Sequence, residues 1–299
     1  MTQTAPCGPA ELADAIVGFV ARKSGISESR VRAVVERVIA EAGDGAVEHL
    51  QARLSRPTAA WSYYPGDALA RRAHHQLAGV VLAEPPTVSG AAHLAAVAGR
   101  PLIIVANHLS YSDANVVEVL LHQCGHGAIA DRLAVIAGPK VYSDLGRRFS
   151  SLCFGTIKSP QNEAVSSGEA AMSAREVAFA ARETLATAQA RLAAGDAVLV
   201  FPEGTRSRTG GMQPFLPGVA RYFKSDDLIV VPIGLSGTEH MFAIGEERLG
   251  SAKIVMSVGA PFTAGSVRAV TGDNRRRFVD RLGAAVAAEL PPQYRGSYA

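Results

Sequence analysis

The sequence predicts an α/β protein, in which a mixed, mainly parallel sheet is flanked by helices and preceded by a small N-terminal helical bundle. The first hundred residues place apolar side chains at helical spacing, and from Pro101 onward short apolar runs alternate with helical segments. Hydrophobic residues make up 48% of the chain and charged residues 19%, the composition of a folded protein. With 299 residues, one large domain or two can form. We expect a helical domain over residues 1–88 and an α/β domain over residues 89–299.

The N-terminal region is expected to form four helices. Their apolar positions recur every three to four residues, and serine or glycine stands where several of them should begin or end. The expected helices cover residues 9–23, 27 or 29 to 43, 47–54 and 68–82. Residues 85–90 are rich in proline, serine and glycine, which is typical of a linker.

The rest of the chain alternates between two patterns. Runs of aliphatic residues predict strands at 102–106, 133–137, 197–201, 228–233 and 253–258. Amphipathic segments predict helices at 114–121, 168–194, 217–223 and 273–290. Ligands of such open α/β sheets bind beyond the carboxyl ends of the strands, so functional residues are expected in the turns that follow strands.

The most informative of these turns follows the strand expected at 102–106. The apolar run stops at Asn107 and His108, and Asp113 stands where the next helix begins. An imidazole titrates near neutral pH, and a carboxylate on its far nitrogen fixes its tautomer and stabilises the imidazolium. His108 and Asp113 are therefore a candidate general base and its orienting acid. The pair alone also fits a capped turn with a hydrogen-bonded histidine.

A second polar turn follows the strand expected at 197–201 and has the sequence FPEGTRSR over residues 201–208. Gly204 permits a positive φ or a close approach to a ligand. Arg206 and Arg208 carry forked donors suited to phosphate, and Glu203 can accept from a substrate hydroxyl or pair with an arginine. Two arginines after a strand also fit a solvated loop.

Three motifs, in order along the chain, resemble those of the glycerolipid acyltransferases. The stretch NHLSYSD at 107–113 resembles their NHx4D box, FPEGTRSR looks like their FPEGTRSR block, and VPIG at 231–234 looks like their last block. Residues 137–159 are similar to the second block of the soluble glycerol-3-phosphate acyltransferases, which also carry a helical domain ahead of the catalytic one. The likeness departs at Lys140 and Pro160, and the FPEGTR form is of the lysophosphatidate type. Both acceptors therefore stay open.

This resemblance implies an enzyme, an O-acyltransferase that moves a fatty acyl group from acyl-coenzyme A or acyl carrier protein to a hydroxyl of glycerol-3-phosphate or lysophosphatidate. His108 would act as the base and Asp113 would support it, with oxyanion donors among the backbone N–H groups near His108 or Gly204. The acyl thioester is a co-substrate and is already activated, so neither a metal nor a permanently bound cofactor is expected. The implied substrate-binding residues are Lys140, Lys158, Glu203, Gly204, Thr205, Arg206 and Arg208.

Two alternatives remain open at this point. The first is an acyltransferase for a non-glycerolipid hydroxyl or amine acceptor, and the second is a non-catalytic module that binds acyl-coenzyme A or lipid. The second is the weaker alternative, because a degenerate enzyme is expected to lose His108 or Asp113, and both are present.

The net charge and the cysteine content limit which binding partners and which cellular compartment are expected. The net charge of +3 and the pI near 8.8 are too mild to indicate nucleic acid. Three cysteines form no even disulfide framework and indicate a reducing compartment. No signal peptide or membrane-spanning stretch is recognised, so we expect a soluble, cytoplasmic protein. The arginines at 275–277 and Arg281 suggest peripheral contact with an anionic membrane, although a solvated face is the commoner meaning of such a run.

Overall fold

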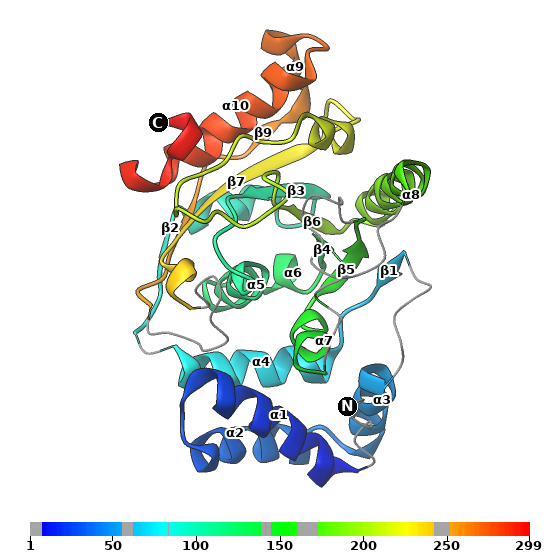
Figure 1. The fold of residues 1–299 in the computed structure, drawn as a ribbon, viewed down its shortest axis with the longest axis vertical. Helices are drawn as coiled ribbons and strands as arrows, with labels where there is room; N and C mark the ends of the chain where they lie inside the picture. The colour runs from blue at the N-terminus through cyan, green and yellow to red at the C-terminus, as the bar shows by residue number, and fades with distance from the viewer. Residues whose placement is uncertain are drawn as a thin grey trace.

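The computed structural model describes residues 8–55, 62–82, 84–138, 141, 145–160, 173–241 and 252–299. Within these residues nine strands form one mixed sheet in the order β1-β5-β4-β6-β3-β7-β8-β2, with β9 beside β7. The central strands β5, β4, β6, β3 and β7 are parallel to one another, whereas β1, β8 and β9 pair antiparallel with β5 or β7. Helices flank this sheet, and further helices precede it (Figure 1). The predicted fold class is confirmed.

The elements of the described residues have the following bounds. The strands are β1 (Tyr63–Tyr64), β2 (Thr87–Ser89), β3 (Leu102–Ala106), β4 (Leu133–Ala137), β5 (Gly155–Lys158), β6 (Ala197–Val200), β7 (Ile229–Ser236), β8 (Val255–Val258) and β9 (Phe262–Thr263). The α-helices are α1 (Pro9–Ser24), α2 (Glu28–Ala40), α3 (Asp44–Ser55), α4 (Ala68–Val81), α5 (Asp113–Gln123), α6 (Gly127–Ala130), α7 (Leu145–Ser151), α8 (Ala174–Ala193), α9 (Ala264–Thr271) and α10 (Arg275–Ala288). Short 3₁₀ helices include η1 (Ala91–Val97) and η4 (Pro217–Tyr222).

The central strands are buried on both faces, which explains why they read as continuous apolar runs. Successive side chains of β3 enter different cores. Leu102 and Ile104 pack in the core that contains α5, α6 and η1, whereas Ile103 and Val105 pack in the core that contains α8, α10 and η4. The sheet therefore has a layer of helices on each side, and the carboxyl ends of β3 and β6 lie next to each other.

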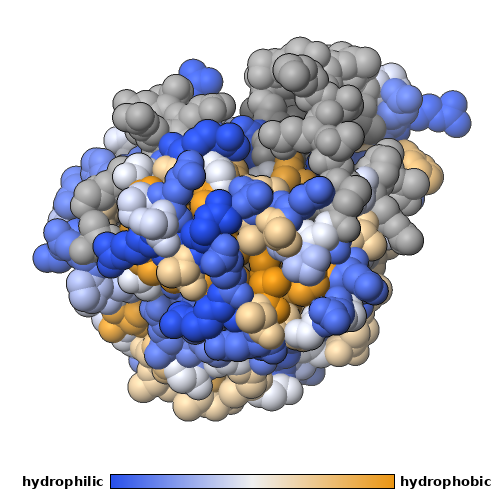
Figure 2. All heavy atoms as spheres, turned by 90° about the horizontal axis from the view of Figure 1, so that it is seen from below, coloured by the Kyte–Doolittle hydropathy of each residue, from blue (hydrophilic) through white to orange (hydrophobic). Residues whose placement is uncertain are grey.

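The N-terminal helices α1 to α4 form a third core together with Phe149 and Leu152, which lie in and just after α7. Asp67 caps α4, because its carboxylate accepts the backbone N–H groups of Leu69 and Ala70. Seen from the side of these helices, the surface is mostly hydrophilic with apolar residues between the polar ones (Figure 2). In the described part of the chain, no helix has the length and apolar character that crossing a bilayer requires.

The structure differs from the sequence-based expectation in several details. The strands β1, β5 and β9 and the helices α6, α7 and α9 were not predicted, and three expected segments differ from their prediction. Thr87–Ser89, inside the expected linker, is the edge strand β2 and pairs in parallel with β8. The segment expected as a helix at 217–223 forms the 3₁₀ helix η4. The helix expected from residue 168 begins at Ala174 within the described residues, where Ser173 and Glu176 form a capping box, and residues 168–172 lie outside them.

Candidate active site

The turn between β3 and α5 holds His108 and Asp113 in contact. Nδ1 of His108 lies 2.8 Å from Oδ2 of Asp113, whose side chain is fully buried. The same carboxylate oxygen accepts the backbone N–H groups of Leu109 and Ser110, at 2.6 and 2.9 Å. Asp113 is also the first residue of α5, where the helix dipole favours a negative charge. The carboxylate therefore fixes the ring, and among the described residues no side chain or backbone group pairs with Nε2, which faces away from Asp113.

Two further contacts hold the ring and its backbone. The imidazole of His108 stacks on Phe201 with the ring centroids 4.4 Å apart. Asn107 bridges to β7, since its side-chain amide donates to the Leu235 carbonyl and its side-chain oxygen accepts the Leu235 N–H. Asn107 thus holds the end of β3 against the neighbouring strand β7. The side chain of His108 is 19% exposed and lines a cleft.

Glu203 connects the second turn to the first. Its side chain is buried, and Oε1 accepts the backbone N–H of His108 at 2.7 Å. Its other oxygen, Oε2, accepts the backbone N–H of Gln213, also at 2.7 Å. Burial raises the pKa of Glu203 from 4.5 to about 7, although both backbone bonds and the nearby His108 oppose this rise. Both oxygens are thus engaged by backbone within the protein.

The backbone of the second turn is shaped to approach the first. Gly204 has φ of 70°, a conformation that side chains with a Cβ rarely adopt. Two residues after Thr205, the backbone N–H of Ser207 donates to the carbonyl of His108 at 2.8 Å. Together with the Glu203 bond, this contact holds the two turns side by side.

The arginines gather around one aromatic ring. The guanidinium of Arg206 lies 3.6 Å from the ring centre of Tyr111, and that of Arg147 lies 5.5 Å from it. Tyr111 is 47% exposed, so the ring forms an open platform for the two cations. Arg208 is exposed and lines the same cleft. This arrangement concentrates positive charge near His108.

The cleft that contains His108 has a volume of about 1670 Å³, larger than the roughly 300–1,000 Å³ of a common small-molecule site. Its polar lining includes the two turns and Arg147, together with Lys23 of α1 and Arg221 of η4. Burial lowers the pKa of His74, which also lines the cleft, to about 4, so this ring is uncharged at neutral pH. Much of the remaining lining is apolar and comes from α4, α5 and nearby segments: Leu77, Val81, Leu82, Val116, Val119, Leu120, Phe149, Phe154, Met241 and Ile254.

Most of the residues expected from the sequence meet at this cleft. His108, Glu203, Gly204, Thr205, Arg206 and Arg208 line it, and Asp113 lies behind His108. Lys158 ends β5 just before Ser159, which lines the cleft, but Lys158 itself is not among the described lining residues. Lys140 lies outside the described residues.

Three contributors were not anticipated from the sequence. Tyr111 lies inside the first motif, so its position was a usable signal, but its stacking with Arg206 depends on the tertiary structure. Arg147 comes from α7, and Gln213 contributes a backbone N–H that any residue except proline could supply. No local pattern marks either of them.

The chain is similar to known proteins at the level of a family model and of a solved structure. The family model described as "Acyltransferase" matches residues 86–236, which is just over half of the chain and includes both turns. Among solved structures, the chain is similar to the 1-acyl-sn-glycerophosphate (LPA) acyltransferase PlsC from Thermotoga maritima. The two share 18% identity with a TM-score of 0.47, and the match covers 94% of this chain and 91% of that chain. No curated protein matches the sequence.

Proposed function

The chain belongs to the acyltransferase family and is an enzyme, and we propose that it moves a fatty acyl group from a thioester to a hydroxyl of glycerol-3-phosphate or lysophosphatidate. The donor in this proposal is acyl-coenzyme A or an acyl carrier protein. One observation carries the proposal: the paired His108 and the cationic Arg206 line a single cleft at the ends of adjacent parallel strands.

In the proposed reaction, Nε2 of His108 removes the proton from the acceptor hydroxyl as its oxygen attacks the thioester carbon. The Asp113 carboxylate, 2.8 Å from Nδ1, stabilises the imidazolium that forms. The tetrahedral intermediate then collapses, the carbon–sulfur bond breaks, and the imidazolium returns its proton to the thiolate. The products are an ester and a free thiol, and His108 regains its starting state.

The oxyanion of the intermediate needs preformed donors. The backbone N–H groups at and just after His108 already donate to side-chain carboxylates, and the Gly204 N–H donates to a carbonyl. Of the N–H groups near His108 or Gly204, these four are therefore not proposed as the donors. Within the described residues, the N–H groups of Thr205 and Arg206 have no acceptor, and both residues line the cleft. We assign the oxyanion site to them.

The phosphate of the acceptor is proposed to bind among the arginines of the cleft. Guanidinium groups pair with phosphate oxygens in a two-pronged manner, so Arg206, Arg208 and Arg147 suit a dianionic group. Anchoring the phosphate would hold the acceptor's hydroxyl near His108 and reduce the entropic barrier of the reaction. In this proposal Glu203 acts on the backbone of the turn, because its oxygens accept backbone N–H groups. Lys140 and Lys158 remain proposed contributors to the same charge.

The acyl chain is proposed to occupy the apolar part of the cleft between α4 and α5. Leu77 and Val81 supply one side of this lining and Val116, Val119 and Leu120 supply the other. Each buried methylene contributes about 0.8 kcal/mol, so such a wall can select chains by their length.

Contact with an anionic membrane stays part of the proposal. Arg275, Arg277 and Arg281 are exposed on α10, and Arg276 pairs with Asp280 at 3.0 Å. Sedimentation with vesicles that contain anionic lipid, compared with neutral vesicles, tests this contact directly.

The function is tested by product mass spectrometry. The purified protein is incubated with acyl-coenzyme A or acyl carrier protein thioesters, and with glycerol-3-phosphate, lysophosphatidate and non-phosphorylated alcohols and amines. Acylation of a phosphorylated glycerol acceptor, lost in His108→Ala, supports the proposal. Acylation of only non-phosphorylated acceptors, or thioester binding without turnover, overturns it in favour of the two alternatives.

A further inference from the structure

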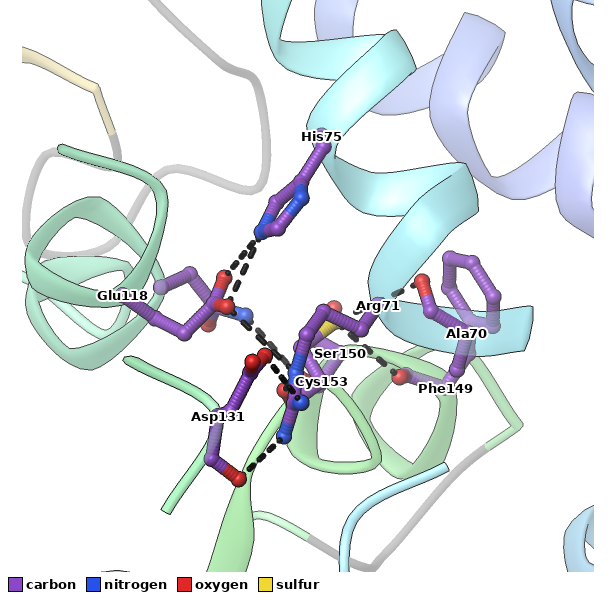
Figure 3. Close-up of polar contacts among 9 residues, drawn as sticks. Ala70, Arg71, His75, Glu118, Asp131, Phe149, Ser150 and Cys153 are labelled. Carbon is purple, nitrogen blue, oxygen red and sulfur yellow. Dashed lines mark hydrogen bonds and ion pairs between the residues drawn. The ribbon is translucent and has the colours of Figure 1, made fainter. Parts of the chain in front are cut away.

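We propose that Arg71 and His75, on helix α4, are positioning residues that set the geometry of the catalytic pair through the buried carboxylate of Glu118. The proposal rests on the proposed roles of His108 and Asp113. Figure 3 shows His75 and Arg71 reaching from α4 toward Glu118, which lies on α5.

Glu118 is a buried acid held from one side. Its side chain is fully buried, and Nε2 of His75 lies 2.9 Å from each of its two oxygens. Nε of Arg71 lies 3.4 Å from Oε1. A buried carboxylate is costly to leave without partners, so these contacts favour one placement of α5 against α4.

Arg71 extends the connection beyond α5. It donates to the carbonyl of Cys153 at 2.8 Å and to the side chain and carbonyl of Asp131, at 2.9 and 3.2 Å (Figure 3). Asn115, one helical turn before Glu118, donates to the carbonyl of Ser150 at 2.9 Å. One face of α5 is therefore tied to α4 directly and to the segment around α7, which α4 also contacts.

The position of Glu118 also affects the first residue of the same helix, Asp113. Asp113 is the first residue of α5, and Glu118 stands five positions later, about 7.5 Å further along the helix axis. A helix of this length moves as a rigid unit, so a shift at Glu118 also displaces the carboxylate of Asp113. That carboxylate lies 2.8 Å from His108, and misplacement by about 1 Å can cost as much as a hundredfold in rate.

The helix that supplies these contacts lies outside the part of the chain that the family model covers. The match begins at residue 86, whereas Arg71 and His75 precede it. Glu118 lies inside the match but has its polar partners on α4. The N-terminal helices thus contribute to the position of the catalytic pair as well as to the wall of the cleft.

The test compares three variants of helix α4. His75→Leu removes the donor to Glu118, and His75→Gln keeps an N–H donor at a similar reach. Asp67→Ala is the matched control, because it removes the cap of the same helix without touching α5. Each variant is measured for kcat, KM and Tm, and by the NMR signal of the His108 Nδ1 proton, which a bond to Asp113 shifts downfield.

The proposal expects kcat to fall about tenfold in His75→Leu, with KM changed less than threefold and the His108 proton signal shifted or broadened. His75→Gln should stay within threefold of wild type in kcat and keep the signal. Asp67→Ala should lower Tm but leave kcat and the His108 proton signal as in wild type. Should His75→Leu fail to fold, Arg71→Gln, which leaves Glu118 paired with His75, takes its place.

Two outcomes overturn the proposal. The first is a folded His75→Leu protein with wild-type kcat and an unchanged proton signal. The second is a fall in kcat that is proportional to the fall in Tm and is the same in His75→Leu and Asp67→Ala. That pattern indicates a purely structural role. If the wild-type protein itself transfers no acyl group, the proposed function has failed and not the positioning proposal. The NMR signal of the His108 proton, which needs no substrate, then tests the positioning role by itself.

Discussion

Glu203 accepts the backbone N–H of His108 at 2.7 Å, so the turn that carries the arginines also fixes the backbone of the proposed base. Its second oxygen fixes the backbone of Gln213 in the same way. The acid thereby joins the turn at His108, 95 residues earlier in the sequence, to the segment at Gln213, ten residues later. Since both acceptor atoms are engaged inside the protein, the residue acts on the geometry of the cleft.

The first prediction concerns the stability of the protein as a function of pH. Burial raises the folded-state pKa of Glu203 to about 7, whereas the unfolded chain keeps a value near 4.5. The folded state thus binds the proton more tightly, and the contribution of Glu203 to stability declines as pH rises from 4.5 to 7. The difference corresponds to roughly 3 kcal/mol at most.

Urea unfolding at pH 5 and pH 8 measures this effect, with Glu203→Gln as the reference. The wild-type free energy of unfolding should fall, relative to the variant, as pH rises. An equal pH dependence in the two proteins contradicts the assignment, because the variant lacks the titrating group.

The second prediction separates the roles of the catalytic pair. His108→Ala should lower kcat by about a hundredfold to ten-thousandfold, the usual contribution of a general base. Asp113→Asn should also lower kcat, because an amide cannot stabilise the imidazolium that forms on His108. Circular dichroism confirms that each variant is folded, and an Asp113→Asn protein of normal kcat would remove Asp113 from the mechanism.

The third prediction concerns the aromatic ring of Tyr111, which contacts the guanidinium of Arg206. Tyr111→Leu removes a cation–π contact worth about 0.5–2 kcal/mol, so KM for a phosphorylated acceptor should rise about two- to thirtyfold. Arg206→Ala should raise it further, and neither change should affect KM for the acyl donor to the same degree. Arg100→Ala is the control, since Arg100 is exposed and is not among the described residues that line the cleft. Unchanged acceptor kinetics in both variants would remove the phosphate role.

Much of the fold follows from local pattern. The strands β3 and β4 have the bounds that their apolar runs predict, and Gly125, with φ of 88°, follows the end of α5, as glycine commonly does at a helix terminus. The two-residue strand β1 and the edge strand β2 were not predicted. Both are too short to show a period, and β2 forms in a proline- and glycine-rich segment only because β8 offers it backbone partners.

The candidate site shows the same division between local and tertiary information. The sequence selects His108 and Arg206 because turns after parallel strands collect functional groups, and β3 and β6 are neighbours in the sheet. It does not reveal that Glu203 binds backbone, or that Arg147 approaches Tyr111, because these contacts join segments with no shared pattern. Contacts across the tertiary structure decide the role of each residue within the site.

The fourth prediction tests the assignment of the acyl chain to the apolar part of the cleft. Leu77 is buried in the core of the N-terminal helices and also lines the cleft, whereas Leu50 is buried in the same core and is not among the described lining residues. Both Leu77→Ala and Leu50→Ala should cost about 2–5 kcal/mol of stability. Only Leu77→Ala should change the preference among saturated acyl donors of graded length, because it alone lengthens the space for the chain.

Each methylene that gains or loses a buried position changes kcat/KM by about fourfold, which follows from about 0.8 kcal/mol per group. The preferred donor of Leu77→Ala should therefore be one or two carbons longer than that of wild type, with a several-fold change in the ratio of long to short products. Competition between donors in one reaction, read by product mass, measures this ratio without any effect of enzyme concentration. An identical product distribution in wild type, Leu77→Ala and Leu50→Ala would place the acyl chain elsewhere.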